Sequence, residues 1–384
     1  MRENMAPLIV ESAVPAESID VEELEKSFDW EEDPLVFIFN NEIPGKVKMH
    51  TRTLNLDDWV KIDKTYPAQM KLRKELLKTH YDKVFCTNED DGCKLAKQEL
   101  LEMLIEYLPK RFPNYYEARE GGIYNKILRE FISSDPNDKM DPLIRCGELT
   151  QEDWCVMEYK EEHNAYVMTA GILYFPMRWS LLDKFNEPMA GIHKPVDGFL
   201  KHLLTKVNDL FKAMSPSAPV WRGNWAIFND LDGPLDLYTP TGHEERNAEN
   251  ETFVYKGDEV TGKLLTFRAE YQTLRKLPKS QSIMFSIRTY QRYLEEFKTL
   301  PLSDSKGLIK AIENLDPDFY IYKGAEFWKD AAITYLKNNI KERVALKKKA
   351  AKKPTDYKKW LIPAAGVAGL ALITGMLILR SRSN

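Results

Sequence analysis

The apolar residues in the first half of the chain recur at intervals of three and four, a spacing that places them on one face of a helix. We therefore predict that this half is largely helical. The segments that show the pattern are residues 69–80, 94–108 and 123–132.

From about residue 165 the pattern changes to short runs rich in β-branched and aromatic residues, which are typical of strands. The predicted strands are residues 166–175, 220–228, 264–273 and 282–290. An amphipathic helix is predicted over residues 198–214, and helical spacing returns over 306–314 and 325–350. This order of elements predicts an α+β fold in which helices cover a mostly antiparallel sheet.

Charge divides the chain further. Residues 1–33 are crowded with Asp and Glu, as in a poorly ordered tail, whereas residues 341–359 are rich in Lys. The predicted organisation is an acidic tail (1–34), a folded domain (35–340) with a helical part (about 35–160), a sheet part (about 161–300) and C-terminal helices (301–340), a basic linker (341–359) and a membrane-spanning helix (360–379).

The run from Trp360 to Leu379 contains no charged residue and is flanked by Lys359 and Arg380. At a rise of about 1.5 Å per residue it spans about 30 Å, the thickness of the hydrocarbon core of a bilayer. We therefore predict a transmembrane helix whose small residues would permit a homodimer through the anchor. The few residues after Leu379 are typical of a tail anchor with the domain in the cytosol, at the mitochondrial outer membrane or the endoplasmic reticulum.

The position of the basic linker also bears on partners. Lysines next to a membrane span are expected to contact anionic membrane lipid, and no nucleic acid partner is expected because the rest of the chain is acidic. The four cysteines form no CxxC pair, so a reducing compartment is expected. The chain lacks the P-loop, GxGxxG, GxSxG and HExxH motifs, which argues against the common nucleotide enzymes, serine hydrolases and zinc hydrolases.

Residues 264–290 are predicted to form two strands joined by a turn. Alternation places Phe267, Ala269 and Tyr271 on one face, and we expect Ile283, Phe285 and Ile287 to share that face. The opposite face is then expected to carry charged and amide side chains. These are Arg268, Glu270, Gln272, Ser286 and Arg288. Alternation alone leaves two interpretations open, a solvated sheet surface or the polar wall of a pocket.

Two further segments contain candidate residues. His193 lies between Gly191 and Pro195 in a loop before the amphipathic helix, and an imidazole held in this way can ligate iron or be an ordinary surface side chain. In the strand 220–228, Trp221 and Trp225 share one face, which is expected to pack into the core, with stacking on a cofactor as the alternative. The opposite face carries Arg222 and Asn224.

Three motifs together resemble those of the haem-dependent oxidative N-demethylase alpha-subunit-like family, whose fungal members are also called HRQ proteins. They are FPMRWSLLDKFNEPMAGIHKPVDGF, PVWRGNWAIF and FRAEYQTLRKLPKSQSIMFSIRTY, in this order along the chain. The earlier segments LDDWVKIDKTYPAQMKLRKELL and YLPKRFPNYY are similar to the N-terminal part of that family. The resemblance covers residues 35–340, and the anchor makes the chain similar to a tail-anchored, fungal-type member.

The resemblance implies a PAS-like domain that holds haem b and oxidises a small amine with oxygen, removing a methyl group as formaldehyde. It implies His193 as the axial metal ligand, Arg268, Arg288 and Arg222 as cofactor-binding residues, and Gln272 with Glu270 as catalytic residues of the distal side. The chain has no flavin or ferredoxin-like segment, so electrons would come from a separate reductase.

The sequence leaves three functions open. The first is a membrane-anchored, haem-dependent monooxygenase acting on a small amine or another small molecule. The second is a PAS-like haem or ligand sensor without turnover, and the third is an adaptor that has kept the fold and lost the cofactor.

Overall fold

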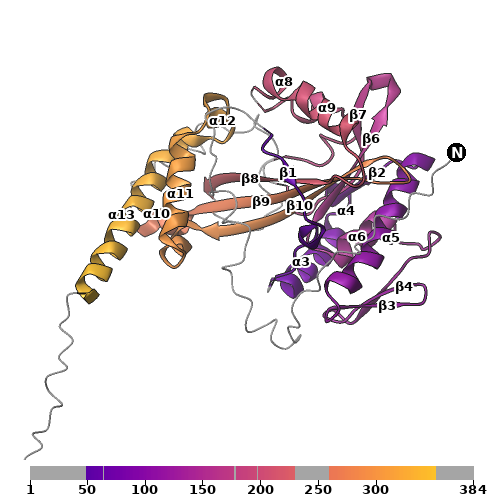
Figure 1. Cartoon of the computed structure of the whole chain (residues 1–384), viewed down its shortest axis with the longest axis horizontal. Coiled ribbons are helices and arrows are strands. Elements are labelled where there is room, and N and C mark those ends of the chain that lie inside the picture. Colours follow the sequence, from indigo (N-terminus) through magenta and orange to yellow (C-terminus); the bar gives the residue numbers. More distant parts are fainter. Residues whose placement is uncertain (1–48, 64, 177–178, 197, 230–258, 352–384) are drawn as a thin grey trace, which may run out of the picture. The chain divides into compact units, whose positions relative to one another are not determined.

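The computed structural model describes residues 49–63, 65–176, 179–196, 198–229 and 259–351. The chain divides into two compact units, Met1–Lys341 and Glu342–Asn384. In the first unit, helices cover an antiparallel sheet (Figure 1), so the predicted α+β class is confirmed.

Within the described residues the main sheet has seven strands in the order β1-β8-β9-β10-β6-β7-β2, and each neighbouring pair is antiparallel. The strands are β1 (Arg52–Thr53), β2 (Phe85–Thr87), β6 (Asp153–Lys160), β7 (Ala165–Ile172), β8 (Val220–Asn229), β9 (Leu265–Lys276) and β10 (Ile283–Tyr293). A smaller antiparallel sheet consists of β3 (Tyr116–Arg119), β4 (Gly122–Asn125) and β5 (Glu130–Ser133).

The described helices come between and after the strands. They are α3 (Tyr66–Thr79), α4 (Tyr81–Val84), α5 (Asp91–Arg111), α6 (Pro142–Leu149), α7 (Met189–Ile192), α8 (Phe199–His202), α9 (Leu204–Ala213), α10 (Glu259–Leu264), α11 (Leu302–Glu313), α12 (Pro317–Tyr322) and α13 (Ala325–Ala351). Short 3-10 turns occur at η2 (Leu56–Asp58), η3 (Glu161–His163) and η5 (Leu294–Lys298).

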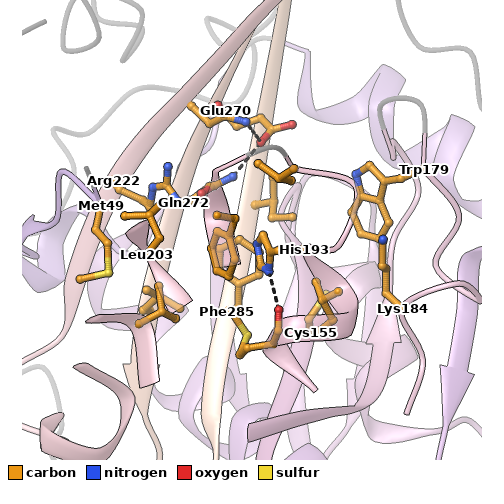
Figure 2. A pocket seen from close by; sticks show the side chains of 18 of the residues that line it. Met49, Cys155, Trp179, Lys184, His193, Leu203, Arg222, Glu270, Gln272 and Phe285 are labelled. Atoms are coloured by element: carbon orange, nitrogen blue, oxygen red, sulfur yellow. Dashed lines mark hydrogen bonds between the residues drawn. The ribbon is translucent and has the colours of Figure 1, made fainter. Parts of the chain in front are cut away.

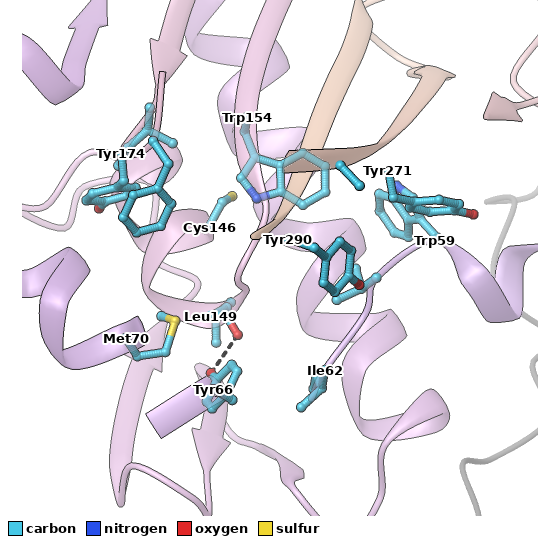
Figure 3. Packing of buried hydrophobic residues seen from close by; sticks show 14 of the residues in the cluster. Trp59, Ile62, Tyr66, Met70, Cys146, Leu149, Trp154, Tyr174, Tyr271 and Tyr290 are labelled. Carbon is cyan, nitrogen blue, oxygen red and sulfur yellow. Dashed lines mark hydrogen bonds between the residues drawn. The ribbon is translucent and has the colours of Figure 1, made fainter. Parts of the chain in front are cut away.

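The larger hydrophobic core lies between one face of the main sheet and the helices α3, α5 and α6. Figure 3 shows part of it, where Trp59 meets Trp154 edge to face at 6.0 Å between ring centroids. Trp221 and Trp225 pack against the same core, as predicted. This core therefore buries one face of the main sheet.

A second core covers the opposite face of the sheet beneath α8 and α9. Phe199, Leu203, Val207 and Phe211 pack there against strand residues such as Met157. The predicted amphipathic helix 198–214 is thus present, although it is divided at Leu203 into α8 and α9. Its apolar face forms a roof over the sheet.

The predicted helix over residues 123–132 is wrong, because this segment forms the hairpin of β4 and β5. The side-chain oxygen of Asn125 accepts hydrogen bonds from the backbone N–H groups of Ile127 and Leu128, both at 3.1 Å, and Arg129 adopts a φ of 60°. This Asx turn reverses the chain before a helix can form. The apolar spacing of the segment is compatible with both structures.

Strand β6 was not predicted, although it lies inside the part expected to be helical. Its residues Asp153 to Glu158 are all buried, because both of its faces are covered. Such a strand shows no alternation of apolar and polar residues, so its periodicity gives no signal.

The predictions for residues 1–34 and 360–379 lie outside the described residues. Among the helices that the structure does describe, none is both long enough and apolar enough for a membrane span.

Candidate functional site

A cavity of about 300 Å³ lies between the main sheet and the roof formed by α8 and α9. Most of its wall is apolar, as is usual for small-molecule and cofactor sites. The apolar lining includes Met157, Met168, Leu173, Phe175, Met189, Ile192, Val196, Phe199, Leu203, Val207, Phe211, Leu274, Phe285 and Ile287.

One end of the cavity is polar, and strand register explains why. Arg222 pairs with Gln272, Asn224 with Glu270, and Ala226 with Arg268 across β8 and β9, so these side chains share the cavity face. Arg268, Glu270 and Gln272 are 3–7% exposed. The pocket-wall interpretation of this face is therefore confirmed, and the solvated-surface interpretation is wrong.

Glu270 is held by hydrogen bonds from three side chains, of which Figure 2 labels Gln272. Gln272 Nε2 donates to Oε2 at 2.7 Å, Asn224 Nδ2 donates to the same oxygen at 3.2 Å, and Arg268 Nε donates to Oε1 at 3.1 Å. Burial acts to raise the pKa of Glu270, but Arg268 and these hydrogen bonds prevail and hold it below its usual value. Glu270 is therefore a fixed anion whose acceptor positions are largely used within the wall.

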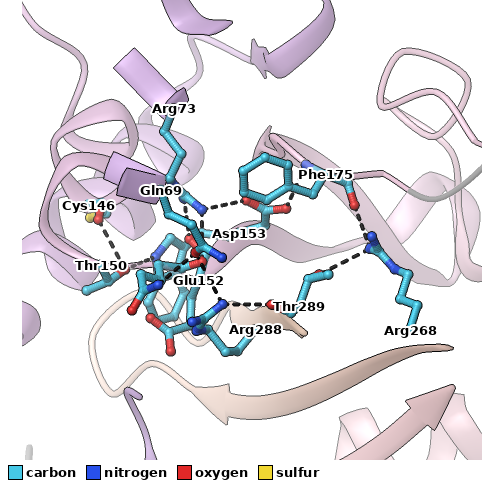
Figure 4. A network of polar contacts seen from close by, with 12 residues as sticks. Gln69, Arg73, Cys146, Thr150, Glu152, Asp153, Phe175, Arg268, Arg288 and Thr289 are labelled. Atoms are coloured by element: carbon cyan, nitrogen blue, oxygen red, sulfur yellow. Dashed lines mark hydrogen bonds and ion pairs between the residues drawn. The ribbon is translucent and has the colours of Figure 1, made fainter. Parts of the chain in front are cut away.

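Arg268 is equally engaged. Besides Glu270, its Nη2 donates to the carbonyl oxygen of Phe175 at 2.5 Å and to Thr289 Oγ1 at 3.1 Å (Figure 4). The amide N–H of Phe175 donates in turn to Asp153, which pairs with Arg73. Arg268 thus connects the polar end of the cavity to a buried network and is rigidly placed.

Two other cations face the cavity. Arg222 takes part in none of the hydrogen bonds or ion pairs among the described residues, and its Nε is buried without a partner there. Lys323, directly after α12, donates through Nζ to the carbonyl oxygen of Trp225 and to Asn224 Oδ1 at 3.5 Å. Burial and the neighbouring Arg222 lower the pKa of Lys323 to about 8, although Glu270 opposes this shift.

His193 lies at the end of α7 and lines the cavity. Its Nδ1 is 3.1 Å from the carbonyl oxygen of Met189, and its ring stacks on Phe199 with centroids 3.9 Å apart and planes 9° from parallel (Figure 2). Burial lowers the pKa of His193 to about 4, so the ring is neutral near pH 7. A neutral ring must carry its proton on Nδ1 to donate to Met189, which leaves the lone pair on Nε2.

The prediction that Arg288 shares a face with Arg268 is wrong. Gln272 pairs with Ile287, so even-numbered residues of β9 lie beside odd-numbered residues of β10, and Arg288 lies on the opposite face. There it pairs with Asp63 and donates to the carbonyl oxygen of Thr289 at 2.7 Å, as part of the network in Figure 4. Ile287 and Phe285 take the cavity positions instead.

Sequence reasoning missed Lys323 as a site residue. Its position before Gly324, which has a φ of 60°, is typical of a lysine that caps a helix C-terminus, so the local sequence does not indicate a cavity. Its partners Asn224 and Trp225 lie almost a hundred residues earlier in the chain. Only the tertiary structure brings them together.

Comparison with known proteins extends this geometry. The family model described as haem-dependent oxidative N-demethylase, alpha subunit-like matches residues 50–333. The chain belongs to this family. The name of the family indicates haem dependence, and the matched region contains the complete cavity wall from Thr51 to Lys323 apart from Met49.

The cavity fits a haem in the kinds of side chain that it offers. His193 presents an imidazole nitrogen, the apolar wall suits the macrocycle, and Arg222 and Lys323 are cations of the kind that carboxylates pair with. The orphaned Nε of Arg222 is consistent with an anionic partner at this end. The demethylase family and the chemistry of the cavity therefore agree.

Proposed function

We propose that the protein is a haem b-binding oxidoreductase that removes a methyl group from a small amine with oxygen, using electrons from a separate reductase. One observation carries the proposal. His193, anchored through Nδ1 and stacked on Phe199, lines a mainly apolar cavity and has a ring nitrogen with a lone pair, Nε2, free of that anchor. A carbonyl that fixes the far nitrogen of a ligand imidazole is a usual feature of metal sites.

We assign each polar residue a role that its contacts allow. His193 would hold the haem iron, whereas Arg268 holds Glu270 in place and Arg222 would contact the bound cofactor. Gln272 uses its amide N–H to bind Glu270, so its carbonyl oxygen remains as the acceptor for an amine N–H. Glu270 would orient Gln272 and stabilise positive charge, since its hydrogen bonds keep it from acting as a mobile base.

When bound, haem would supply the oxidation: with oxygen and two electrons from the reductase, one methyl group leaves as formaldehyde and the second oxygen atom leaves as water. The chain itself encloses the substrate and keeps out water through the apolar residues of α8 and α9. The antiparallel sheet with a helical roof over one face supports such enclosure.

The proposal is tested by the absorption spectrum of the full chain, purified in detergent and supplied with haem. A Soret band that follows saturable 1:1 binding is expected. Reduction under carbon monoxide should then shift the band, because catalysis needs one open axial position. Absence of haem binding would reject the proposal.

Binding without turnover is the second candidate function. It is favoured by the hydrogen-bonded state of Glu270, which is typical of a fixed binding wall. The two functions differ in product: a sensor should bind haem or ligand but release no formaldehyde from dimethylamine when a reducing system and oxygen are present.

We further propose that residues 360–379 attach the protein to a membrane with the cavity-containing domain in the cytosol, because this run is apolar and has basic flanks. Anionic lipid and a second copy of the anchor would be its partners there. Deletion of residues 360–384 should move the protein to the soluble fraction. If the truncated protein still sedimented with membranes after an alkaline carbonate wash, this proposal would be contradicted.

A further inference from the structure

The polar end of the cavity carries more positive than negative side chains. We define this polar end as Arg222, Asn224, Arg268, Glu270, Gln272 and Lys323. Three of these side chains are cationic and one is a carboxylate, so an excess of two positive charges remains when Lys323 is protonated. Excess buried charge is costly unless an anion balances it.

Glu270 does not balance all three cations. Arg268 contacts it directly, with both Nε and Nη2 at 3.1 Å from Oε1. Its other oxygen accepts from Gln272 and Asn224. Among the three cations, Arg268 is therefore the one that contacts Glu270 directly, and Glu270 acts on Arg222 and Lys323 only through space.

Arg222 is placed to bind a ligand. It is the cross-strand neighbour of Gln272 and lies on the same, cavity-lining face of the sheet. It enters none of the hydrogen bonds or ion pairs that the structure shows among its described residues. Burial is the main cause that lowers its pKa, with Glu270 acting in the opposite direction. A partly buried guanidinium whose Nε has no partner among the described residues gains from a carboxylate, which it can bind through two N–H groups.

Lys323 adds a second donor at the same end. It is 9% exposed, and its Nζ uses two contacts, Trp225 O and Asn224 Oδ1, out of the three donors of an ammonium group. The ring of Trp225 lies 5.1 Å from Nζ. The backbone and the ring thus orient the ammonium group while one N–H remains for a ligand.

We propose that Arg222 and Lys323 together form a carboxylate-binding site at the polar end of the cavity. The carboxylate has two possible sources: a propionate of the haem, or the acid group of a zwitterionic substrate such as an N-methyl amino acid. Next to Arg222 and Lys323 themselves a simple alkylammonium ion is disfavoured because these two cations repel it, whereas the carbonyl oxygen of Gln272 remains open to an amine N–H. Both sources rest on the proposed haem function, whereas the binding of a carboxylate by the haem-free chain does not.

The first arm of the test measures haem. The dissociation constants of haem and of its dimethyl ester, which lacks both carboxylates, are determined by Soret titration of the full chain and of Arg222→Gln and Lys323→Gln. If a propionate is the ligand, each variant should bind haem about 10 to 100 times more weakly than the wild type and bind the ester equally well. Lys206→Gln, an exposed change on α9, is the matched control.

The second arm measures a small carboxylate. Calorimetry of the haem-loaded protein compares N-methylglycine with dimethylamine, two amines that differ in the acid group. If the substrate carboxylate is the ligand, Arg222→Gln and Lys323→Gln should bind haem normally but lose about tenfold or more in affinity for N-methylglycine. Wild-type preference for dimethylamine would argue against this source.

A third measurement separates the two proposals. Glutarate is titrated into the haem-free chain, and the fluorescence of Trp225 beside Lys323 is followed, with Trp225→Phe to identify the signal. If the protein binds no haem, the haem function fails, but saturable glutarate binding that both variants weaken would retain the carboxylate site. The site is rejected if both variants, folded by circular dichroism, bind haem, N-methylglycine and glutarate as the wild type does.

Discussion

The imidazole of His193 stacks on the ring of Phe199, with the two centroids 3.9 Å apart. Phe199 begins α8, so the roof of the cavity fixes the ring of a residue that belongs to the preceding loop. The stacking fixes the plane of the imidazole ring, and the contact of Nδ1 with the carbonyl oxygen of Met189 fixes how the ring is turned within that plane. These two contacts define where Nε2 points before any cofactor binds.

His193→Ala should fold and lose or shift the Soret band. The substitution removes the proposed iron ligand, while Phe199 and the other roof residues keep their contacts with the sheet. Haem titration and circular dichroism check the two halves of this expectation. An unchanged band with unchanged haem affinity would contradict the assignment.

His202→Ala is the matched control for that experiment. His202 is exposed on α8, only a few residues away, and does not line the cavity. Its variant should keep the wild-type spectrum. Loss of the band in both variants would indicate a general effect on the roof and not removal of a ligand.

Glu270→Gln should destabilise the protein far more than Gln272→Ala. Neutralising Glu270 leaves the buried Arg268 without its counter-ion, which costs about 3 kcal/mol. Gln272→Ala removes one hydrogen bond and costs about 1 kcal/mol. Urea unfolding of both variants measures the difference.

Gln272→Ala should nevertheless weaken ligand binding, because Gln272 faces the cavity and Glu270 keeps two other donors. Unchanged affinity for every amine and carboxylate that the wild type binds would show that Gln272 has only a structural role.

Arg288→Met should lower the free energy of unfolding by about 3 kcal/mol and leave the haem spectrum unchanged. Arg288 is buried and pairs with Asp63 on the sheet face opposite the cavity, so its loss leaves a mostly buried carboxylate unpaired. Burial tends to raise the pKa of Asp63, but Arg288 and neighbouring hydrogen bonds hold it below its usual value, so this pKa should rise in the variant.

The exposed pair of Arg119 and Glu117 provides the comparison. Arg119→Met should change stability little, as is usual for exposed ion pairs. A shifted Soret band in Arg288→Met would mean that the network of Figure 4 transmits a change across the sheet.

The site shows what local sequence can and cannot predict. Alternation correctly placed Arg268, Glu270 and Gln272 on one face of β9, because a strand has a fixed period of two. It could not decide which residues of β10 lie beside them, because that depends on the length of the connection between the strands. The connection 277–282 has six residues, so an even-numbered residue of β9 pairs with an odd-numbered residue of β10. Arg288 therefore lies on the face opposite Arg268.

Tertiary contacts account for the other differences. Residues 123–132 satisfy helical spacing, but Asn125 forms a turn that the spacing does not register. Strand β6 is covered on both faces, so its sequence lacks alternation. The side chain of Lys323 is positioned by its hydrogen bonds to Asn224 and Trp225. These residues are distant in the sequence, so no local pattern predicts the contact.

The affinity of the haem-free protein for glutarate should fall as the pH rises through about 8. Burial, together with the adjacent Arg222, lowers the pKa of Lys323 to about 8, and Glu270 is the facing anion that partly restores it. Above this pH Lys323 becomes neutral and its share of the carboxylate site is lost, whereas Arg222 stays charged. Bound glutarate favours the charged lysine, so the fall in affinity is expected to extend somewhat above pH 8.

Stability should change in the opposite direction over the same range. Lys323 has a folded pKa below the usual lysine value of 10.5, so between about pH 8 and 10.5 the unfolded chain holds a proton that the folded chain has released. The free energy of unfolding of the wild type relative to Lys323→Gln should therefore increase as the pH rises through this window. Lys323→Gln should bind glutarate more weakly than the wild type, and its affinity should change little between pH 7 and 9. Over this range calorimetry measures the affinity for glutarate and urea unfolding measures the stability of both proteins. If the affinity for glutarate changed equally with pH in the wild type and in Lys323→Gln, the titrating group would be another residue, and Lys323 would not belong to the carboxylate site.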